Sequence, residues 1–190
     1  LLLIPTTLSA QKDPHAQEIE NLSEAILDMT TTTRRHLWWR PCGERFRGSS
    51  MEAKAYAMNL ASHLVAAADE DLDPGIMAAI IMQESAFNPC AFSNRESAEY
   101  RRQLGRRPNR RDVLALLRSP RMRATYGISG MDGGLAQFRW PGTVARRVGI
   151  ENPEELLDVQ TSMTALAAAL RLYKARCEEH PVFEVTDTDE

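Results

Sequence analysis

Glu84 is the residue of this chain whose type and place best suit acid–base chemistry. Asp73 and Pro74 form a typical helix start, an N-cap acid followed by proline at the first helical position. The helix that they open is expected to end at Glu84 or Ser85, shortly before an Asn-Pro pair that stops it. The sequence therefore predicts a carboxylate in the last turn of a helix.

This helix is expected to turn Glu84 toward the interior or a cleft. Met77, Ile80 and Ile81 precede Glu84 at helical spacing, so the carboxylate would continue an apolar stripe. Burial disfavours the charged form of a carboxyl group, as does the partial negative charge at a helix C-terminus. A glutamate kept protonated in this way can act as a general acid near neutral pH. An ordinary glutamate turned toward solvent fits the same stretch.

A second stretch of interest lies about fifty residues further along the chain and is rich in glycine. The segment from Tyr126 to Gly134 is expected to form an irregular loop or a short hairpin. Residues 84–89 read ESAFNP, residues 134–137 read GLAQ and residues 141–143 read PGT. In this order, after the lead-in DPGIMAAII, the segments resemble the lytic transglycosylases, which have a lysozyme-like fold and cleave the glycan strands of peptidoglycan. The resemblance covers roughly residues 71–176.

The resemblance implies a mainly α, lysozyme-like single domain, with a buried catalytic helix and a glycine-rich loop across a cleft from it. Glu84 would be the catalytic acid. Gln137 would contact the substrate, or alternatively its side-chain amide would hydrogen-bond the backbone of its own loop. The residues implied to contact the substrate are Ser85, Gly134, Leu135, Gln137 and Phe138.

The implied reaction cleaves the β-1,4 bond between N-acetylmuramic acid and N-acetylglucosamine. Glu84 would protonate the glycosidic oxygen and then take a proton from the 6-hydroxyl of the muramic ring, which closes a 1,6-anhydro ring without water. The partner is the glycan strand of peptidoglycan, and no cofactor is implied.

Departures from the family pattern leave other functions open. Ala136 stands where the family usually has Met, and the chain lacks the A-Y-N-A-G segment whose tyrosine lies near the catalytic glutamate; Tyr173 matches no motif. A hydrolase like the goose-type lysozymes would need a second acid to position water, and Asp132 is the candidate, although Asp before Gly is often a turn residue. A non-catalytic glycan-binding or assembly protein is the third possibility.

An arginine-rich insert separates the two motifs. Residues 95–123 carry ten arginines against three acidic residues, a local charge of +7. Such a segment could bind an acidic cell-wall polymer or a protein partner, or it could be a solvated helical hairpin with one short helix at 111–118. Nucleic acid is not an expected partner, because the net charge is −3 and the insert has few stacking residues.

The remaining segments suit a single exported domain. Residues 1–10 are apolar and end in small residues, as in the remnant of a secretory signal, which predicts a periplasmic or secreted protein; a stray apolar strand is the alternative. Residues 11–48 should form an N-terminal helix and a tryptophan-rich loop, residues 49–177 the main domain, and residues 178–190 an acidic tail. No other run is long enough to predict stable membrane insertion.

Three cysteines, Cys42, Cys90 and Cys177, cannot all pair within the chain. One disulfide is expected in an oxidising compartment, most simply between Cys42 and either of the others. None of the cysteines has metal-ligand spacing with the four histidines, so no metal site is predicted.

Overall fold

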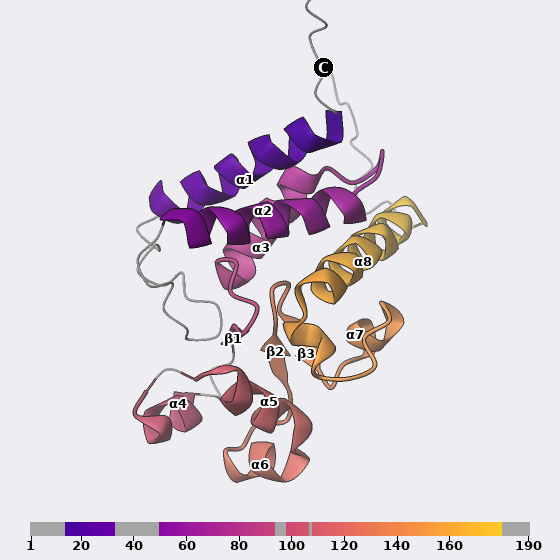
Figure 1. Cartoon of the computed structure of the whole chain (residues 1–190). Helices are drawn as coiled ribbons and strands as arrows, with labels where there is room; N and C mark the ends of the chain where they lie inside the picture. Colours follow the sequence, from indigo (N-terminus) through magenta and orange to yellow (C-terminus); the bar gives the residue numbers. More distant parts are fainter. Residues whose placement is uncertain (1–13, 33–49, 94–97, 107, 180–190) are drawn as a thin grey trace, which may run out of the picture.

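The structure is a computed structural model of the chain, and it describes residues 14–32, 50–93, 98–106 and 108–179. The mainly helical fold expected from the sequence is confirmed, with a small sheet between two groups of helices (Figure 1). The predictions for residues 1–10, the tryptophan-rich loop, Cys42 and residues 180–190 lie outside the described residues.

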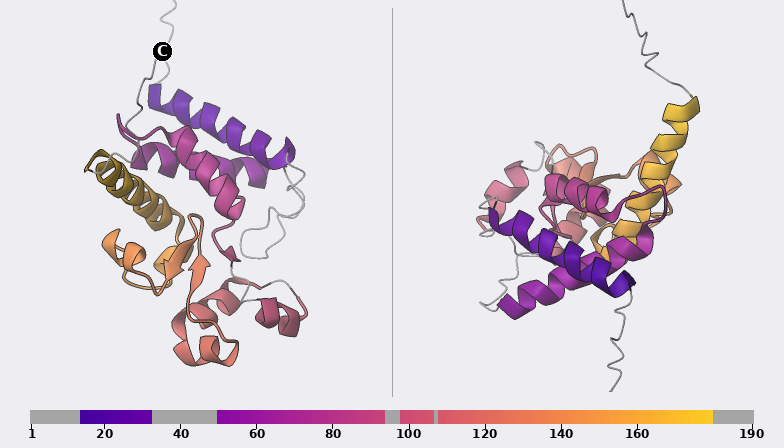
Figure 2. Two further views of the ribbon diagram at one scale, coloured as in Figure 1. Left: turned by 180° about the vertical axis from the view of Figure 1, so that it is seen from behind. Right: turned by 90° about the horizontal axis from the view of Figure 1, so that it is seen from above.

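Three helices form the first group: α1 (Pro14–Thr32), α2 (Ser50–Ala67) and α3 (Pro74–Ser85). α1 packs against both α2 and α3, and the views in Figure 2 show the three together at one end of the molecule. Their shared core contains Leu22 and Ile26 of α1, Leu60 and Leu64 of α2 and Ile81 of α3. The predicted amphipathic N-terminal helix is therefore part of the hydrophobic core.

The cap of α3 is the one predicted from the sequence. The carboxylate of Asp73 accepts hydrogen bonds from the backbone N–H groups of Gly75 at 2.6 Å and Ile76 at 3.1 Å, and Pro74 is the first helical residue. These bonds satisfy two of the N–H groups that have no partner inside a helix. Local sequence therefore determines where α3 begins.

The second group of helices lies beside the sheet, and this part of the molecule contains a hydrophobic cluster of its own. The antiparallel sheet has the order β1-β2-β3, with β1 at Phe92–Ser93, β2 at Met131–Gly133 and β3 at Phe138–Trp140. The helical elements are α4 (Ala98–Leu104), α5 (Arg110–Arg118), α6 (Pro120–Thr125), α7 (Thr143–Arg147), the 3-10 turn η4 (Glu155–Leu157) and α8 (Val159–Glu179). None of the described helices is both long and apolar enough to cross a membrane.

The arginine-rich insert differs from the predicted solvated hairpin, because its helices build this second cluster. Val113, Leu116 and Leu117 of α5 are buried there, as is Tyr100 of α4. The buried guanidinium of Arg123 donates hydrogen bonds to the carbonyls of Leu116 and Leu117, at the end of α5. The insert is therefore a structural part of the domain.

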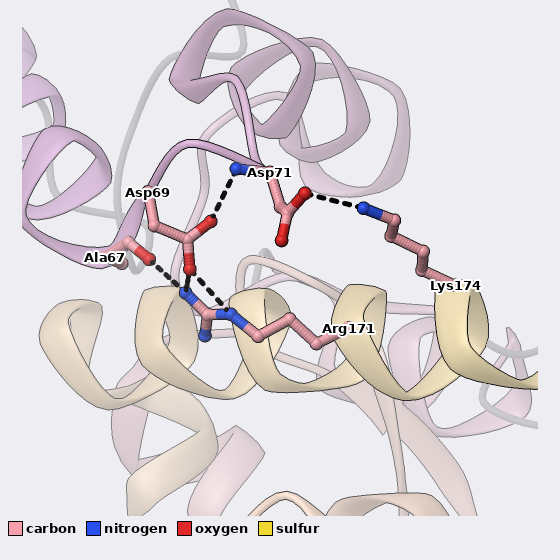
Figure 3. A network of polar contacts seen from close by, with 5 residues as sticks. All are labelled: Ala67, Asp69, Asp71, Arg171 and Lys174. Atoms are coloured by element: carbon pink, nitrogen blue, oxygen red, sulfur yellow. Dashed lines mark hydrogen bonds and ion pairs between the residues drawn. The ribbon is translucent and has the colours of Figure 1, made fainter.

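Helix α8 connects the two groups. Met163 and Leu166 pack in the first cluster, whereas Ala165 packs in the second. Further along α8, polar contacts fix this helix to the turn between α2 and α3 (Figure 3). Arg171 donates to Asp69, with Nε–Oδ2 at 2.9 Å, and Lys174 donates to Asp71 at 2.6 Å. These contacts hold the turn that precedes α3 against α8.

Replacing Asp69 with Asn should lower the thermal stability in a pH-dependent way. The hydrogen bonds from Arg171 hold the pKa of the Asp69 carboxyl below its ordinary value of 3.8. A carboxyl whose pKa is lowered by folding stabilises the protein above its unfolded pKa and loses that contribution as the pH falls through the folded value. The melting temperature of Asp69→Asn should lie a few degrees below that of the wild type near neutral pH, since exposed ion pairs contribute little, and the two should converge in acid.

Glu70→Gln is the matched control, because Glu70 is exposed and has no hydrogen-bond or ion-pair partner among the described residues. An equal decrease for both variants, or a difference that persists in acid, would contradict this account of the contact.

Candidate active site

Glu84 lies in the last turn of α3, as predicted, but its side chain is exposed. The buried face of α3 is formed by Met77, Ala78, Ile81 and Met82. Glu84 instead continues the row of Ile80, which is half-buried, and Ile76, which is 62% exposed. The prediction that Glu84 faces the interior is therefore wrong, because the buried stripe of α3 is centred about one residue away from the row that Glu84 continues.

Within the described ranges, no hydrogen bond or ion pair joins Glu84 to another residue. Its neighbour Ser85 is half-buried, and the Ser85 hydroxyl donates to the carbonyl of Ile81 at 3.1 Å. Such a bond to the preceding turn of the helix is common for serine. Of these two adjacent side chains, that of Glu84 is the one accessible to a ligand.

The chain leaves α3 through a tight turn. Ala86 and Phe87 both have positive φ, 51° and 59°, and the Ala86 N–H donates to the carbonyl of Met82 at 3.1 Å. The Asn88 N–H then donates to the carbonyl of Ser85 at 3.1 Å. The side chain of Phe87 is fully buried in the first cluster, which anchors the turn.

Ala91 joins this segment to the second motif. Its carbonyl accepts hydrogen bonds from the Gly134 N–H at 3.0 Å and from the Gln137 Nε2 at 3.1 Å. Gln137 Nε2 also donates to the carbonyl of Gly134 at 2.7 Å. The structure thus brings together the segment after Glu84 and the GLAQ hairpin, by which we mean β2, the turn at residues 134–137 and β3. Ala91 was not among the residues predicted for the site, and nothing in its type signals this role.

The side-chain amide nitrogen of Gln137 is thus bound to backbone carbonyls, as in the alternative role considered for this residue. Its Oε1 atom is buried and has no hydrogen-bond partner in the described part of the chain. Gln137 itself has positive φ, 51°, in the turn of the hairpin. In this arrangement the residue shapes the turn.

Gly134 and Leu135, in the turn of the hairpin, are both buried. Gly134 has φ +79°, and a Cβ built there would lie 1.9 Å from the carbonyl oxygen of Leu156. Leu135 is fully buried in the first cluster, so its side chain cannot contact a substrate. Phe138 is half-buried and packs against the second cluster. Gly134 and Leu135, both predicted to contact the substrate, are therefore buried, whereas Phe138 is partly accessible.

Asp132, the candidate for positioning water, is a strand residue and not a turn residue. It pairs with Arg139 across β2 and β3, with Oδ1 and Nη1 at 3.8 Å. About a third of its side chain is accessible, 34%. The carboxylate is thus half-exposed beside a cation.

Among the described residues, no group of three or more His, Cys, Asp or Glu could hold a metal ion. Cys90, one residue before Ala91, is disulfide-bonded, whereas Cys177 is exposed and free. The third cysteine, Cys42, lies outside the described residues. The disulfide therefore involves the segment that links Glu84 to the GLAQ hairpin.

Gly134→Ala should destabilise the protein strongly. The left-handed backbone costs a non-glycine residue about 1–2 kcal/mol, and forcing a methyl group into a packed site costs about 1–3 kcal/mol more. We expect a loss of about 3 kcal/mol in the free energy of unfolding, measured by urea denaturation.

Gly127→Ala separates the two contributions, since Gly127 has a similar φ of +69° but a Cβ built there would meet no atom within 4 Å. This control should lose only the backbone part, about 1–2 kcal/mol. Equal losses for both variants would show that Gly134 does not approach Leu156 as closely as described.

Comparison with known proteins gives one finding. A family model described as the Transglycosylase SLT domain matches residues 63–186, well over half of the chain. No curated protein and no solved structure matches significantly. The matched range begins within α2 and contains both Glu84 and the GLAQ hairpin. The chain therefore belongs to the SLT transglycosylase domain family.

Proposed function

We propose that this protein is a peptidoglycan lytic transglycosylase that cleaves the β-1,4 bond between N-acetylmuramic acid and N-acetylglucosamine. Family membership supports a transglycosylase that acts on peptidoglycan. One structural observation carries the assignment of the acid: Glu84 presents an exposed carboxylate at the end of α3, and the chain that follows it is hydrogen-bonded through Ala91 to the GLAQ hairpin.

In the proposed reaction, one carboxyl group acts twice. Protonated Glu84 donates its proton to the glycosidic oxygen as the bond from that oxygen to C1 of the muramic ring breaks. The ionised carboxylate then accepts the proton of the 6-hydroxyl, whose oxygen forms the new bond to C1. The product is a 1,6-anhydro end, and Glu84 returns to its protonated form.

Because Glu84 is exposed, the bound glycan strand itself would determine how much water reaches the carboxyl group. A strand lying over the end of α3 would cover the carboxyl and exclude water from it. That water exclusion strengthens the electrostatic interactions of the reacting groups and protects the intermediate from hydrolysis. Ser85 and Phe138, both half-buried, are the proposed neighbours of the strand, and Gln137 holds the hairpin in shape.

Hydrolysis is the second candidate, and the half-exposed carboxylate of Asp132 is the feature that favours it. A hydrolase would use water in place of the 6-hydroxyl and would release reducing ends. The pairing of Asp132 with Arg139 gives that carboxylate a structural role within the sheet, so we place hydrolysis second.

We also propose that the protein acts in the periplasm or outside the cell, where peptidoglycan lies. The disulfide at Cys90 supports this proposal, because disulfides persist in oxidising compartments.

The described arginines of the insert that do not bind backbone carbonyls fall into two groups. Arg106 and Arg118 form ion pairs with Asp112 and Glu154. Arg110, Arg111 and Arg121 are exposed, and their side chains form no hydrogen bond or ion pair in the described ranges. Arg110 lies near enough to Asp158 for an electrostatic interaction. We propose these three arginines as the contact for an acidic cell-wall polymer or protein.

Glu84→Gln should abolish glycan cleavage while leaving binding to peptidoglycan intact. The amide keeps the size of the side chain but cannot donate an acidic proton, and losing a general acid typically costs about 10²–10⁴-fold in rate. The measurement is a digest of purified peptidoglycan followed by mass spectrometry of the released muropeptides. The wild type and the control Glu70→Gln should release products one water lighter than reducing muropeptides.

The products distinguish the candidate functions. Reducing ends from the wild type would establish a hydrolase, and Asp132→Asn should then remove the activity. Protein that binds peptidoglycan without cleaving it would contradict the enzymatic proposal and favour a glycan-binding or assembly protein.

A further inference from the structure

The turn that follows Glu84 has an unusual backbone. Ala86 and Phe87 are consecutive non-glycine residues in the left-handed region, with φ of 51° and 59°. Residues other than glycine rarely adopt this backbone conformation, and it persists only where surrounding contacts enforce it. Such turns are concentrated at functional sites.

A contact from another helix holds this turn. Tyr56 of α2 donates a hydrogen bond from its hydroxyl to the carbonyl oxygen of Phe87 at 2.8 Å. The same residue, Phe87, is fully buried through its ring, so both its side chain and its carbonyl are fixed. Burial raises the pKa of Tyr56 well above its ordinary value, so the hydroxyl stays a donor throughout the working pH range of a protein.

The position of this hydrogen bond matters for Glu84. Phe87 follows Glu84 by three residues, and the intervening backbone is short and hydrogen-bonded to the last turn of α3. A change in the path of the chain at Phe87 would therefore move the end of the helix that presents the carboxylate. Displacements of about 1 Å in a reacting group can cost about 100-fold in rate.

We propose that Tyr56 is a positioning residue for Glu84, acting through the left-handed turn at Ala86 and Phe87. This inference rests on the proposed function. Tyr56 lies before the residues that match the family model, 63–186, so the proposal gives the N-terminal part of α2 a role in the reaction.

The test compares Tyr56→Phe with Tyr100→Phe in the full-length chain. Both substitutions keep an aromatic ring and remove a hydroxyl that donates to a backbone carbonyl; for Tyr100 the acceptor is Asp112, at 3.3 Å in the arginine-rich insert. The rate of muropeptide release is measured against peptidoglycan concentration. Tyr56→Phe should lower kcat about tenfold or more with KM changed by less than about twofold, because the effect is on the reacting group and not on binding. Tyr100→Phe should retain the wild-type kcat.

Amide hydrogen exchange provides a readout that does not depend on activity. In Tyr56→Phe, exchange at the N–H groups of Ala86 and Asn88 should accelerate about tenfold or more relative to the wild type, while Tyr100→Phe leaves it unchanged. Unchanged exchange would overturn the proposal. A lower melting temperature with an unchanged kcat would overturn it as well, since that pattern shows only a structural role.

Failure of the proposed function has a different signature. A wild-type protein that releases no muropeptides would defeat both the enzymatic assignment and the catalytic role of Tyr56. Glu84-dependent release by the wild type, with Tyr56→Phe equally active, would defeat the role of Tyr56 alone.

Discussion

The hydrogen bonds at the carbonyl of Ala91 connect the two parts of the site. This one oxygen accepts from the backbone of Gly134 and from the side chain of Gln137, residues more than forty positions further along the chain. Because Gly134 has no side chain, the turn of the hairpin can approach the backbone of Leu156 closely. The helix that ends at Glu84 and the hairpin that follows the insert thus form one connected framework, held by directional bonds with little tolerance for displacement.

The arginine-rich insert shows why local charge is a poor guide to solvation. Its apolar residues at 113, 116 and 117 are close enough to cover one face of a short helix, and the second cluster depends on them. Several of its arginines serve the fold: Arg101 donates to the carbonyl of Phe92 and lies over the Phe92 ring, and Arg123 is buried against the end of α5. Only the arginines that remain exposed and unpaired in the described part of the chain are available to a partner.

Local rules predicted the helices well. Asp73 and Pro74 predicted the start of α3, and the apolar residues of 111–118 predicted α5 with an error of one residue.

The side-chain environments were harder to predict, because they depend on which neighbour packs against each face. Glu84 continues a row that is apolar in sequence, yet α1 and α2 pack against a different stripe of α3 and leave that row exposed. Leu135 was predicted to contact a ligand from its place in the GLAQ segment, but its side chain is buried in the core. The role of Ala91 is expressed entirely through its backbone, so its type carries no signal.

The central claim is that the carboxyl of Glu84 meets the glycosidic oxygen of a peptidoglycan strand bound along the GLAQ hairpin. A crystal structure of Glu84→Gln with a peptidoglycan tetrasaccharide tests this claim most directly. The account predicts the bridging oxygen of one N-acetylmuramic acid–N-acetylglucosamine linkage within about 2.6–3.2 Å of the side-chain amide at position 84, the reach required of a general acid. A tetrasaccharide bound at another surface, or along the hairpin with its linkages out of reach of residue 84, would contradict it.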